Sequence, residues 1–434
     1  MLEQIRRLIL EQKDITGYKI CETKIHSNEL FFVKKNVDMD RAKDVLHYKV
    51  TIYIDFEENK MKYTGSSATF LHPTMTEKEM IDAIKEAAFA ARYVKNPYYP
   101  LVKPATSYQT LPESRFAKES FSYWMDEITK AVYRNDIYDK GGINSCEIFL
   151  EKEETRIVNS EGVDVSEVNY KCMVEFITTW KEEGEEIELY RCINCSDFDG
   201  ELLASEVKNM ITICREKAIA QPTPALKTFP VIFTRSAVKE LFSYYCFMGK
   251  AASVYNQYST WKTGDQLQGD KVMGDLITIT LDPLAKNSTA SAAFDEDGFA
   301  LAPVRLIEQG VLKKYSADRR YAYYLGVETT GSIGNVIVDG GSRTAKELQA
   351  EPHIMAAAFS DFSMDVVTGD FGGEIRLAWY YDGEKIIPVT GGSITGNLNE
   401  LHQELYLSKE LQKDNDFEGP QMVKIMNCTV AGID

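Results

Sequence analysis

The chain has 434 residues and a formal net charge of −17. This length exceeds what one compact core usually holds and predicts two domains. The negative charge repels phosphate backbones, and no run of basic residues offsets it, which argues against direct nucleic-acid binding. The hydrophobic share of 44% is ordinary for a folded protein and argues against extensive disorder.

Targeting signals and cysteines bear on the compartment. Charged residues at positions 3, 6 and 7 interrupt the region in which a signal peptide carries its apolar core. The sequence holds no run of 18 or more apolar residues, so no membrane span is expected. The eight cysteines are scattered from Cys21 to Cys428, which predicts reduced, buried thiols rather than a disulfide framework. Together these observations predict a cytoplasmic protein.

Residues 1–221 repeat one order of elements, in which a helix is followed by strands and a second helix. Apolar residues recur on one helical face near the N-terminus, and Thr76 with Glu79 forms a capping box before a later helix. Alternating apolar and polar residues predict strands, and a proline-punctuated stretch around residues 97–112 separates the two cycles. The predicted elements are helices 2–13, 80–94, 118–134 and 201–219, strands 18–23, 29–37, 47–55, 60–65, 145–151, 155–159, 166–181 and 186–193, and turns 57–59 and 159–162.

Pro222 and Pro224 mark a natural boundary, and the pattern changes beyond it. One helix, 236–248, is followed by many short strands between glycine-rich turns, with short helices possible at 345–350 and 400–407. Dense turns of this kind are typical of a curled or barrel-like sheet. We therefore predict an α+β protein. Residues 1–221 form a mostly antiparallel sheet covered by helices, and residues 222–434 form a β-rich, barrel-like domain.

The histidine pattern argues against a conventional zinc site. A helical zinc motif needs two histidines about one turn apart, so that both rings face one ion. None of the five histidines has such a neighbour. They are His26, His47, His72, His353 and His402.

Two further motifs have simpler interpretations. Cys192 and Cys195 form a single C-x-x-C pair, but no second close pair completes a zinc knuckle, so small apolar residues at a strand end are favoured. Residues 195–206 partly match a calcium-binding loop, with a cysteine where a hard cation needs a carboxylate oxygen. Asp199 as the N-cap of the following helix explains these acidic residues better.

An ordered series of motifs in the C-terminal half is the most specific signal. The motifs include Phe294-Asp-Glu-Asp-Gly298, Arg305-Leu-Ile-Glu-Gln-Gly-Val-Leu312, Val367-Thr-Gly-Asp-Phe371 and Pro388-Val-Thr-Gly-Gly-Ser-Ile-Thr-Gly-Asn397. In this order and spacing they resemble the C-terminal half of the TldD/PmbA family, formerly labelled modulators of DNA gyrase. The N-terminal half resembles the family more loosely, mainly through its helix–sheet pattern.

The family has two kinds of member. The D-type subunit carries a His-Glu-x-x-x-His helix and a later cysteine, which bind zinc. The matching helix here, residues 236–246, contains Glu240 but no histidine, and no cysteine lies between Leu405 and Asn427. The chain therefore resembles the PmbA, or TldE, type. This resemblance implies no catalytic residue, no metal ligand and no cofactor in this chain, with zinc expected in the D-type partner.

The resemblance also implies a function. It points to a non-catalytic, metal-free subunit of a TldD/TldE-type zinc metallopeptidase complex that degrades or processes small or unfolded peptides. The expected partners are a TldD-type zinc subunit in a heterodimer, or a second copy in a homodimer, together with a peptide substrate but no nucleic acid or membrane. The alternative is an adaptor that binds gyrase or an antitoxin without proteolysis. An autonomous hydrolase would require a cleft with convergent acidic residues.

The family motifs also supply candidate contact residues for a substrate groove or a partner. Asp295, Glu296 and Gly298 are expected to form a tight acidic turn near the cleft that corresponds to the D-type active site. A plain hairpin turn, with Asp295 as a cap inside it, is the alternative. The remaining candidates are Thr330, Gly331, Gly369 and Asp370.

Overall fold

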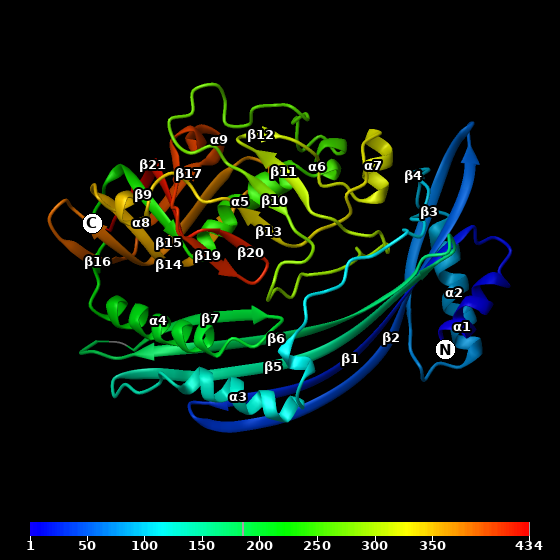
Figure 1. The fold of residues 1–434 in the computed structure, drawn as a ribbon, viewed down its shortest axis with the longest axis horizontal. Coiled ribbons are helices and arrows are strands. Elements are labelled where there is room, and N and C mark those ends of the chain that lie inside the picture. Colours follow the sequence, from blue (N-terminus) through cyan, green and yellow to red (C-terminus); the bar gives the residue numbers. More distant parts are fainter. Residues whose placement is uncertain (185, 434) are drawn as a thin grey trace.

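The computed structural model describes residues 1–184 and 186–433. It contains a long curved N-terminal sheet and a compact C-terminal β-rich region that packs against the sheet's inner side (Figure 1). The predicted fold class, α+β with a barrel-like second half, is confirmed. No helix in the described part of the chain is long and apolar enough to span a membrane.

The N-terminal sheet is antiparallel throughout, in the order β4-β3-β2-β1-β5-β6-β7. Helices α1 and α2 cover one end of it, and α3 and α4 cover the other (Figure 1). The capping box of Thr76 and Glu79 is present at the start of α2. The strands are β1 (Gly17–Val33), β2 (Asn36–Glu58), β3 (Met61–Leu71), β4 (Asn96–Pro97), β5 (Gly141–Asn159), β6 (Asp164–Trp180) and β7 (Ile187–Cys195), and the helices are α1 (Leu2–Leu10), α2 (Glu77–Ala91), α3 (Phe121–Tyr133), α4 (Gly200–Ala218) and the short 3-10 helix η1 (Arg115–Ala117).

The strands of this sheet are longer than the sequence predicted. β1 runs unbroken through residues 24–28, where the pattern is polar, because Ser27 and Glu29 are buried against the sheet and satisfied by each other and by Arg41. The first hairpin turns at Lys34, whose φ is 54°, so the predicted strand 29–37 was wrong across the turn. Lysine carries none of the usual turn signals, which explains the error.

The C-terminal region contains a closed ring of strands, β14-β9-β21-β17-β15, which β14 and β15 complete by pairing with each other. A second, six-stranded sheet lies beside it in the order β12-β11-β10-β13-β20-β19. The strands are β8 (Gln221–Pro222), β9 (Lys227–Thr234), β10 (Ile279–Leu281), β11 (Val304–Glu308), β12 (Val311–Leu312), β13 (Val336–Val338), β14 (His353–Met364), β15 (Asp370–Tyr381), β16 (Ile386–Thr390), β17 (Ser393–Asn397), β18 (Leu405–Leu407), β19 (Leu411–Asp414), β20 (Phe417–Pro420) and β21 (Met422–Ala431).

The C-terminal helices are short except for α5, which the sequence placed at its observed bounds. The predicted helix 345–350 is present as α8, but the predicted helix 400–407 was wrong at its end, where β18 pairs with β21. The helices are α5 (Ser236–Met248), α6 (Ala251–Tyr255), α7 (Arg319–Leu325), α8 (Ala345–Leu348), α9 (Leu398–Leu401) and the 3-10 helix η2 (His402–Glu404).

Three large apolar cores hold the molecule together. One lies within the C-terminal ring and around α5, and two lie beneath the helices of the N-terminal sheet. The core beneath α3 and α4 also takes in Ala357 of β14 and Leu377 of β15, so it joins the two halves. Between the halves, Ile157 of β5 packs against Ala293 and Phe294. The boundary at residues 221 and 222 stays a prediction.

Candidate functional site

Helix α5 occupies the position where the family resemblance places the zinc-binding helix. It follows β9 directly, and its apolar face, including Val238, Leu241 and Tyr245, is buried in the C-terminal core. Glu240 lies on the same helix and is partly buried, which raises the pKa of its carboxyl, while the neighbouring Lys239 opposes this shift. The helix is therefore anchored by hydrocarbon packing and carries one poorly solvated acid.

The two positions that would carry histidines hold residues of different chemistry. When the His-Glu-x-x-x-His pattern is placed with its glutamate on Glu240, the histidine positions fall on Lys239 and Tyr244. Lys239 Nζ lies 2.6 Å from Asp416 Oδ1, and the buried Tyr244 hydroxyl donates to Asn399 Oδ1. An ammonium group has no lone pair, and a buried neutral phenol is a poor zinc donor. The residues at this position do not fit a zinc ion.

The sulfur and imidazole groups near α5 do not complete such a site. Burial raises the pKa of the Cys246 thiol to about 12 and also raises that of Cys428 in β21, so both thiols stay protonated. His402 stacks on Tyr245, with its Nδ1 3.4 Å from the tyrosine hydroxyl, and burial lowers its pKa. Within residues 1–184 and 186–433, no group of three or more His, Cys, Asp or Glu side chains is placed to hold a metal ion.

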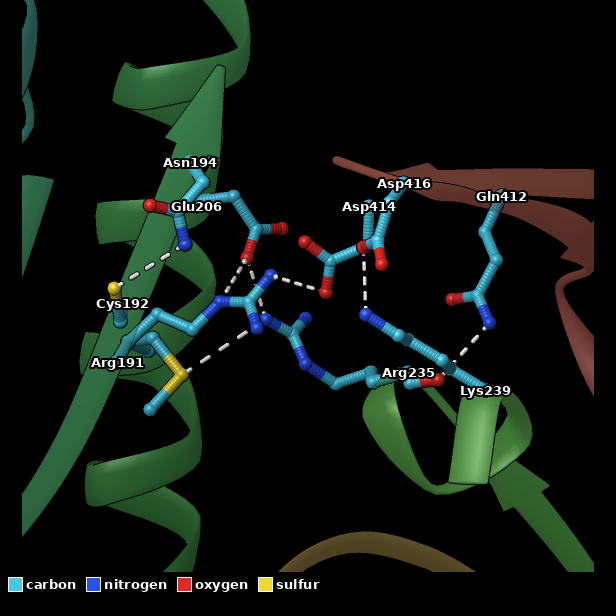
Figure 2. A network of polar contacts seen from close by, with 10 residues as sticks. Arg191, Cys192, Asn194, Glu206, Arg235, Lys239, Gln412, Asp414 and Asp416 are labelled. Atoms are coloured by element: carbon cyan, nitrogen blue, oxygen red, sulfur yellow. Dashed lines mark hydrogen bonds and ion pairs between the residues drawn. The ribbon is translucent and has the colours of Figure 1, made fainter. Parts of the chain in front are cut away.

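A charge network joins the start of α5 to the N-terminal sheet (Figure 2). Glu206 of α4 accepts hydrogen bonds from Arg191 of β7 at 3.2 Å and from Arg235 at 2.5 Å, and Arg191 also donates to Asp414 of β19 at 3.1 Å. All four side chains are at least three-quarters buried. The charges balance, so this network connects the two halves rather than offering free charge to a ligand.

Arg235 has an unusual backbone conformation in this network. Its φ is 59° and its ψ is −133° at the residue before α5, a region that side-chain-bearing residues rarely adopt. Its guanidinium reaches Glu206, while its carbonyl accepts a hydrogen bond from Gln412 Nε2 at 3.0 Å. The surrounding contacts therefore hold a strained residue in place.

Residues 295–299 form a tight hairpin turn with Asp295 as a cap inside it, as the alternative interpretation expected, and the turn contacts the N-terminal sheet. A role of its acidic residues in binding stays a prediction. Asp295 is buried, and its carboxylate accepts from the backbone N–H groups of Asp297 at 2.9 Å, Phe299 at 3.0 Å and Ser332 at 3.3 Å. Burial, helped by the nearby Asp297 charge, raises the pKa of Asp295 to about 6 despite these bonds. Asp297 forms an ion pair with Lys19 of β1, and Glu296 is exposed.

Two of the predicted glycines are required by close packing around this turn. Gly298 has φ 78°, and a Cβ there would lie 2.6 Å from Val163 Cγ1 of the N-terminal sheet. Gly331 has φ 76°, and its Cβ would lie 2.3 Å from Leu301 Cδ2 and 3.2 Å from Asp295 Oδ2. The Thr330 hydroxyl accepts from Ala317 N at 2.8 Å. The structure thus brings Asp295, Gly298 and Gly331 together in a contact between the halves.

Gly369 and Asp370 lie in a separate turn. Asp370 Oδ1 accepts from Asn397 Nδ2 at 2.8 Å, and the Gly369 carbonyl accepts from Leu398 N at 2.7 Å. Asn399 Nδ2 donates to Thr368 O at 2.9 Å. This turn is exposed, and through Asn399 it is connected to Tyr244 of α5. A role of these residues in binding stays a prediction.

Sequence reasoning missed a cleft between the N-terminal sheet and the C-terminal half. A cavity of about 620 Å³ lies where β6, the proline-punctuated segment and the C-terminal half meet. Its walls include Tyr108, Leu111, Glu167, Tyr170 and Phe294. The segment around residue 108 is held to the C-terminal half by hydrogen bonds from Tyr108 to Gly298 O and from Gln109 to Leu301 O. The prolines predicted an extended crossover, but no local signal showed which strand it would face.

The fold and the site define an α+β protein whose second half contains a closed ring of strands and the helix α5, with no zinc-ligand set among the described residues. Residues 226–432 match the family model described as the PmbA/TldA metallopeptidase C-terminal domain. Over these residues, just under half of the chain, it is similar to the C-terminal domain of the PmbA/TldD family.

Several proteins of known sequence are also similar to this chain. An uncharacterised protein of Methanocaldococcus jannaschii is 24% identical over 306 residues, which is 68% of this chain and 70% of that protein. The Metalloprotease PmbA homolog of Haemophilus influenzae is 25% identical over 197 residues, 43% of each chain. A Metalloprotease TldD homolog of Buchnera aphidicola is 28% identical over 194 residues, 38% of this chain and 40% of that one. The alignments with the named metalloproteases thus span less than half of their length.

Solved structures share the whole fold. TldE from Thermococcus kodakarensis superposes with a TM-score of 0.79 at 18% identity, covering 99% of this chain and 100% of that one. A Thermotoga maritima protein, described as a candidate modulator of a DNA gyrase, gives the same TM-score and coverage at 15% identity. At these identities the likeness establishes the fold alone.

Proposed function

We propose that this chain is a metal-free, non-catalytic subunit of a TldD/TldE-type metallopeptidase complex that acts on small or unfolded peptides. The observation that carries the proposal is the chemistry of α5. Where a zinc helix needs two imidazoles, this helix carries Lys239, paired with Asp416, and Tyr244, bonded to Asn399. An ammonium at a ligand position repels a divalent cation, so this chain contributes to peptide hydrolysis only through a partner.

The names of the relatives support the rest of the proposal. The family description and the PmbA relative are metallopeptidases by name, and both a TldE structure and a TldD homologue are similar to this chain. We infer that a TldD-type chain supplies the zinc and forms a heterodimer with this one, or that the chain pairs with itself. The action takes place in the cytoplasm, as the sequence predicts.

Zinc content and peptide cleavage test the proposal. The purified chain is measured alone and after mixing with a purified TldD-type chain from the same genome, using an unstructured fluorogenic peptide. We expect less than about one zinc per ten chains and no hydrolysis for the chain alone, and zinc-dependent hydrolysis from the mixture. Stoichiometric zinc in the chain alone, or hydrolysis without the partner, contradicts the proposal.

The name of the Thermotoga protein keeps the adaptor function as an alternative. Co-purification distinguishes the two. Stable association with a gyrase subunit or an antitoxin, with no association with a TldD-type chain, favours the adaptor.

A further inference from the structure

The N-terminal half of strand β6 has an open edge. Its pairing with β5 runs from Asp164 to Trp180, whereas its pairing with β7 begins only at Cys172, opposite Cys195. After Cys195 the chain leaves the sheet to begin α4. Along residues 164–171, β6 therefore has a strand neighbour on one side only, and among the described residues no other strand pairs with it there.

The register shows which backbone groups face the open side. The Val163 carbonyl accepts a hydrogen bond from Asn159 N, and Asn159 Oδ1 accepts one from Val163 N, so residue 163 faces β5. In an antiparallel pair the N–H and C=O of one residue point to the same side, and the side alternates along the strand. Without a bulge in this stretch, the backbone groups of Asp164, Ser166, Val168 and Tyr170 point to the open side.

The 620 Å³ cleft surrounds this edge. Every residue of β6 from Asp164 to Tyr170 lines it. Since side chains alternate between the two faces of a strand, a cavity that touches consecutive residues faces the edge itself. The edge is about 25 Å long over eight residues at roughly 3.3 Å each, which matches a peptide of similar length.

The opposite wall also presents backbone groups. Residues 109–113 line the cleft without forming a helix or strand, with Tyr108 and Gln109 attached to the C-terminal half through their side chains. For Thr110, Leu111 and Glu113, the described part of the chain shows no hydrogen bond from the main-chain N–H group. The lining of the cleft thus includes backbone donors from this segment as well as from the β6 edge.

We propose that this cleft binds an extended segment of polypeptide, which pairs with residues 164–170 of β6 and continues the sheet past the end of β7. Only an extended main chain offers alternating donors and acceptors at the spacing that such an edge requires. The inference rests on the proposed function, which makes a peptide the substrate of the complex. It gives this chain a peptide-binding surface of its own, separate from any zinc site in a partner.

The charges of the cleft select the occupant. Its walls carry the carboxylates of Glu113 and Glu167 against the single ammonium of Lys118, while the Asp164 carboxylate is already paired with Arg156 at 2.8 Å. Phosphate-bearing strands are repelled by such a lining, while peptides with lysine or arginine are attracted. Tyr108, Val168 and Tyr170 supply apolar surface between the charges. The preferred ligand is an unstructured peptide in which basic and β-branched residues alternate.

A fluorescein-labelled peptide, capped at both ends, with the sequence Thr-Lys-Val-Arg-Val-Lys-Thr, serves as the probe, and anisotropy reports its binding to the full chain. Val168→Pro removes one outward N–H, a change that edge positions tolerate. Val168→Ala is the matched control, because it removes the side chain and keeps the N–H. We expect at least tenfold weaker binding for Val168→Pro and less than threefold weaker binding for Val168→Ala.

Equal affinities of the two variants, or no binding by the unsubstituted chain at millimolar concentration, would overturn the inference. Peptides N-methylated at one residue at a time give a second measurement with the unsubstituted chain, in case the proline variant does not fold. Their binding is expected to weaken at every second residue, and a uniform response would also refute pairing. All these binding measurements use this chain alone. Failure to bind the peptide therefore contradicts the peptide site, whereas failure to hydrolyse peptides with a D-type partner contradicts the proposed function.

Discussion

Asp295 shows how much a single residue can be predicted from sequence. The family motif and the following Gly298 predicted a tight turn, with a hairpin capped by Asp295 as one interpretation, and the carboxylate does accept three backbone N–H groups there. The expected place of this turn beside a cleft that corresponds to the D-type active site stays a prediction. That the turn packs on the N-terminal sheet, with Asp297 paired to Lys19, depends on a contact between residues 278 positions apart, and no local pattern encodes it.

The raised pKa of Asp295 predicts a specific pH dependence of stability. Its pKa is about 6 in the folded chain against 3.8 in the unfolded chain, so the folded state holds the proton more tightly. Between about pH 4 and 6 the free energy of unfolding therefore falls as pH rises, by roughly 3 kcal/mol in total from this group. In Asp295→Asn this contribution is absent. The free energy of unfolding of the parent minus that of the variant is therefore expected to decrease between about pH 4 and 6.

Urea unfolding at a series of pH values measures this difference. Glu296→Gln, an exposed position in the same turn, is the control, and its stability curve is expected to run parallel to that of the parent. A parallel curve for Asp295→Asn as well would show that the carboxyl titrates normally in the folded chain.

The backbone conformation at position 235 is expected to favour glycine over alanine. With φ at 59° and ψ at −133°, any residue with a Cβ is strained there, and relief of such strain is worth roughly 1–3 kcal/mol. Both Arg235→Gly and Arg235→Ala lose the bond to Glu206, so their difference isolates the backbone. We expect the glycine variant to unfold at higher urea concentration than the alanine variant. Arg191 lies in a regular strand, and glycine weakens a strand. We therefore expect Arg191→Gly to unfold at lower urea concentration than Arg191→Ala.

Whole elements were predictable where their pattern is local. Helix α5 and the capping box of α2 follow from adjacent residues, and both were placed correctly. The long strands β1 and β5 were each divided in two, because their polar middle stretches are stabilised by side chains of the neighbouring strands. The open edge of β6 arises from the unequal lengths of β6 and β7, and it becomes visible only once the register is known.

Hydrogen exchange tests that edge in the free chain. The amides of Ser166, Val168 and Tyr170 point to the cleft and are expected to exchange quickly. Those of Val165 and Glu167, bonded to β5, are expected to exchange at least tenfold more slowly, since opening of the ladder must precede exchange. Residue-resolved NMR measures both sets. Equal protection along residues 164–170 would show that another part of the chain already covers the edge.

At the scale of the whole molecule, several contacts fix how the halves sit against each other. They include the Asp295 turn on the face of β5 and β6, the network of Arg191, Glu206, Arg235 and Asp414, and the packing of Ala357 and Leu377 into the core beneath α3 and α4. The 620 Å³ cleft lies between walls from both halves, so its shape depends on these contacts. The sequence predicted the class of each half, but it held no information on their relative placement, because the contacting residues are distant in sequence.

Removal of Glu206 therefore has an effect beyond its own helix. Glu206→Gln leaves Arg191 and Arg235 largely buried with only Asp414 to balance them, and loss of one partner of a buried ion pair costs roughly 3 kcal/mol or more. Glu201→Gln on the same helix is the control, because its side chain is 87% exposed and pairs with Arg134 at the surface. That change is expected to alter stability by less than about 0.5 kcal/mol.

Urea unfolding gives the two free energies, and small-angle X-ray scattering gives the radius of gyration. We expect Glu206→Gln to unfold at a clearly lower urea concentration and to scatter as a larger particle, because the halves separate when the arginines lose their shared carboxylate. The same variant is expected to bind the Thr-Lys-Val-Arg-Val-Lys-Thr peptide more weakly, since the cleft loses one wall. If Glu206→Gln and Glu201→Gln behave alike in both measurements, the network does not hold the halves together. The apolar contacts, those of Ala357 and Leu377 with the core beneath α4 and that of Ile157 with Phe294, are then the main connection between them.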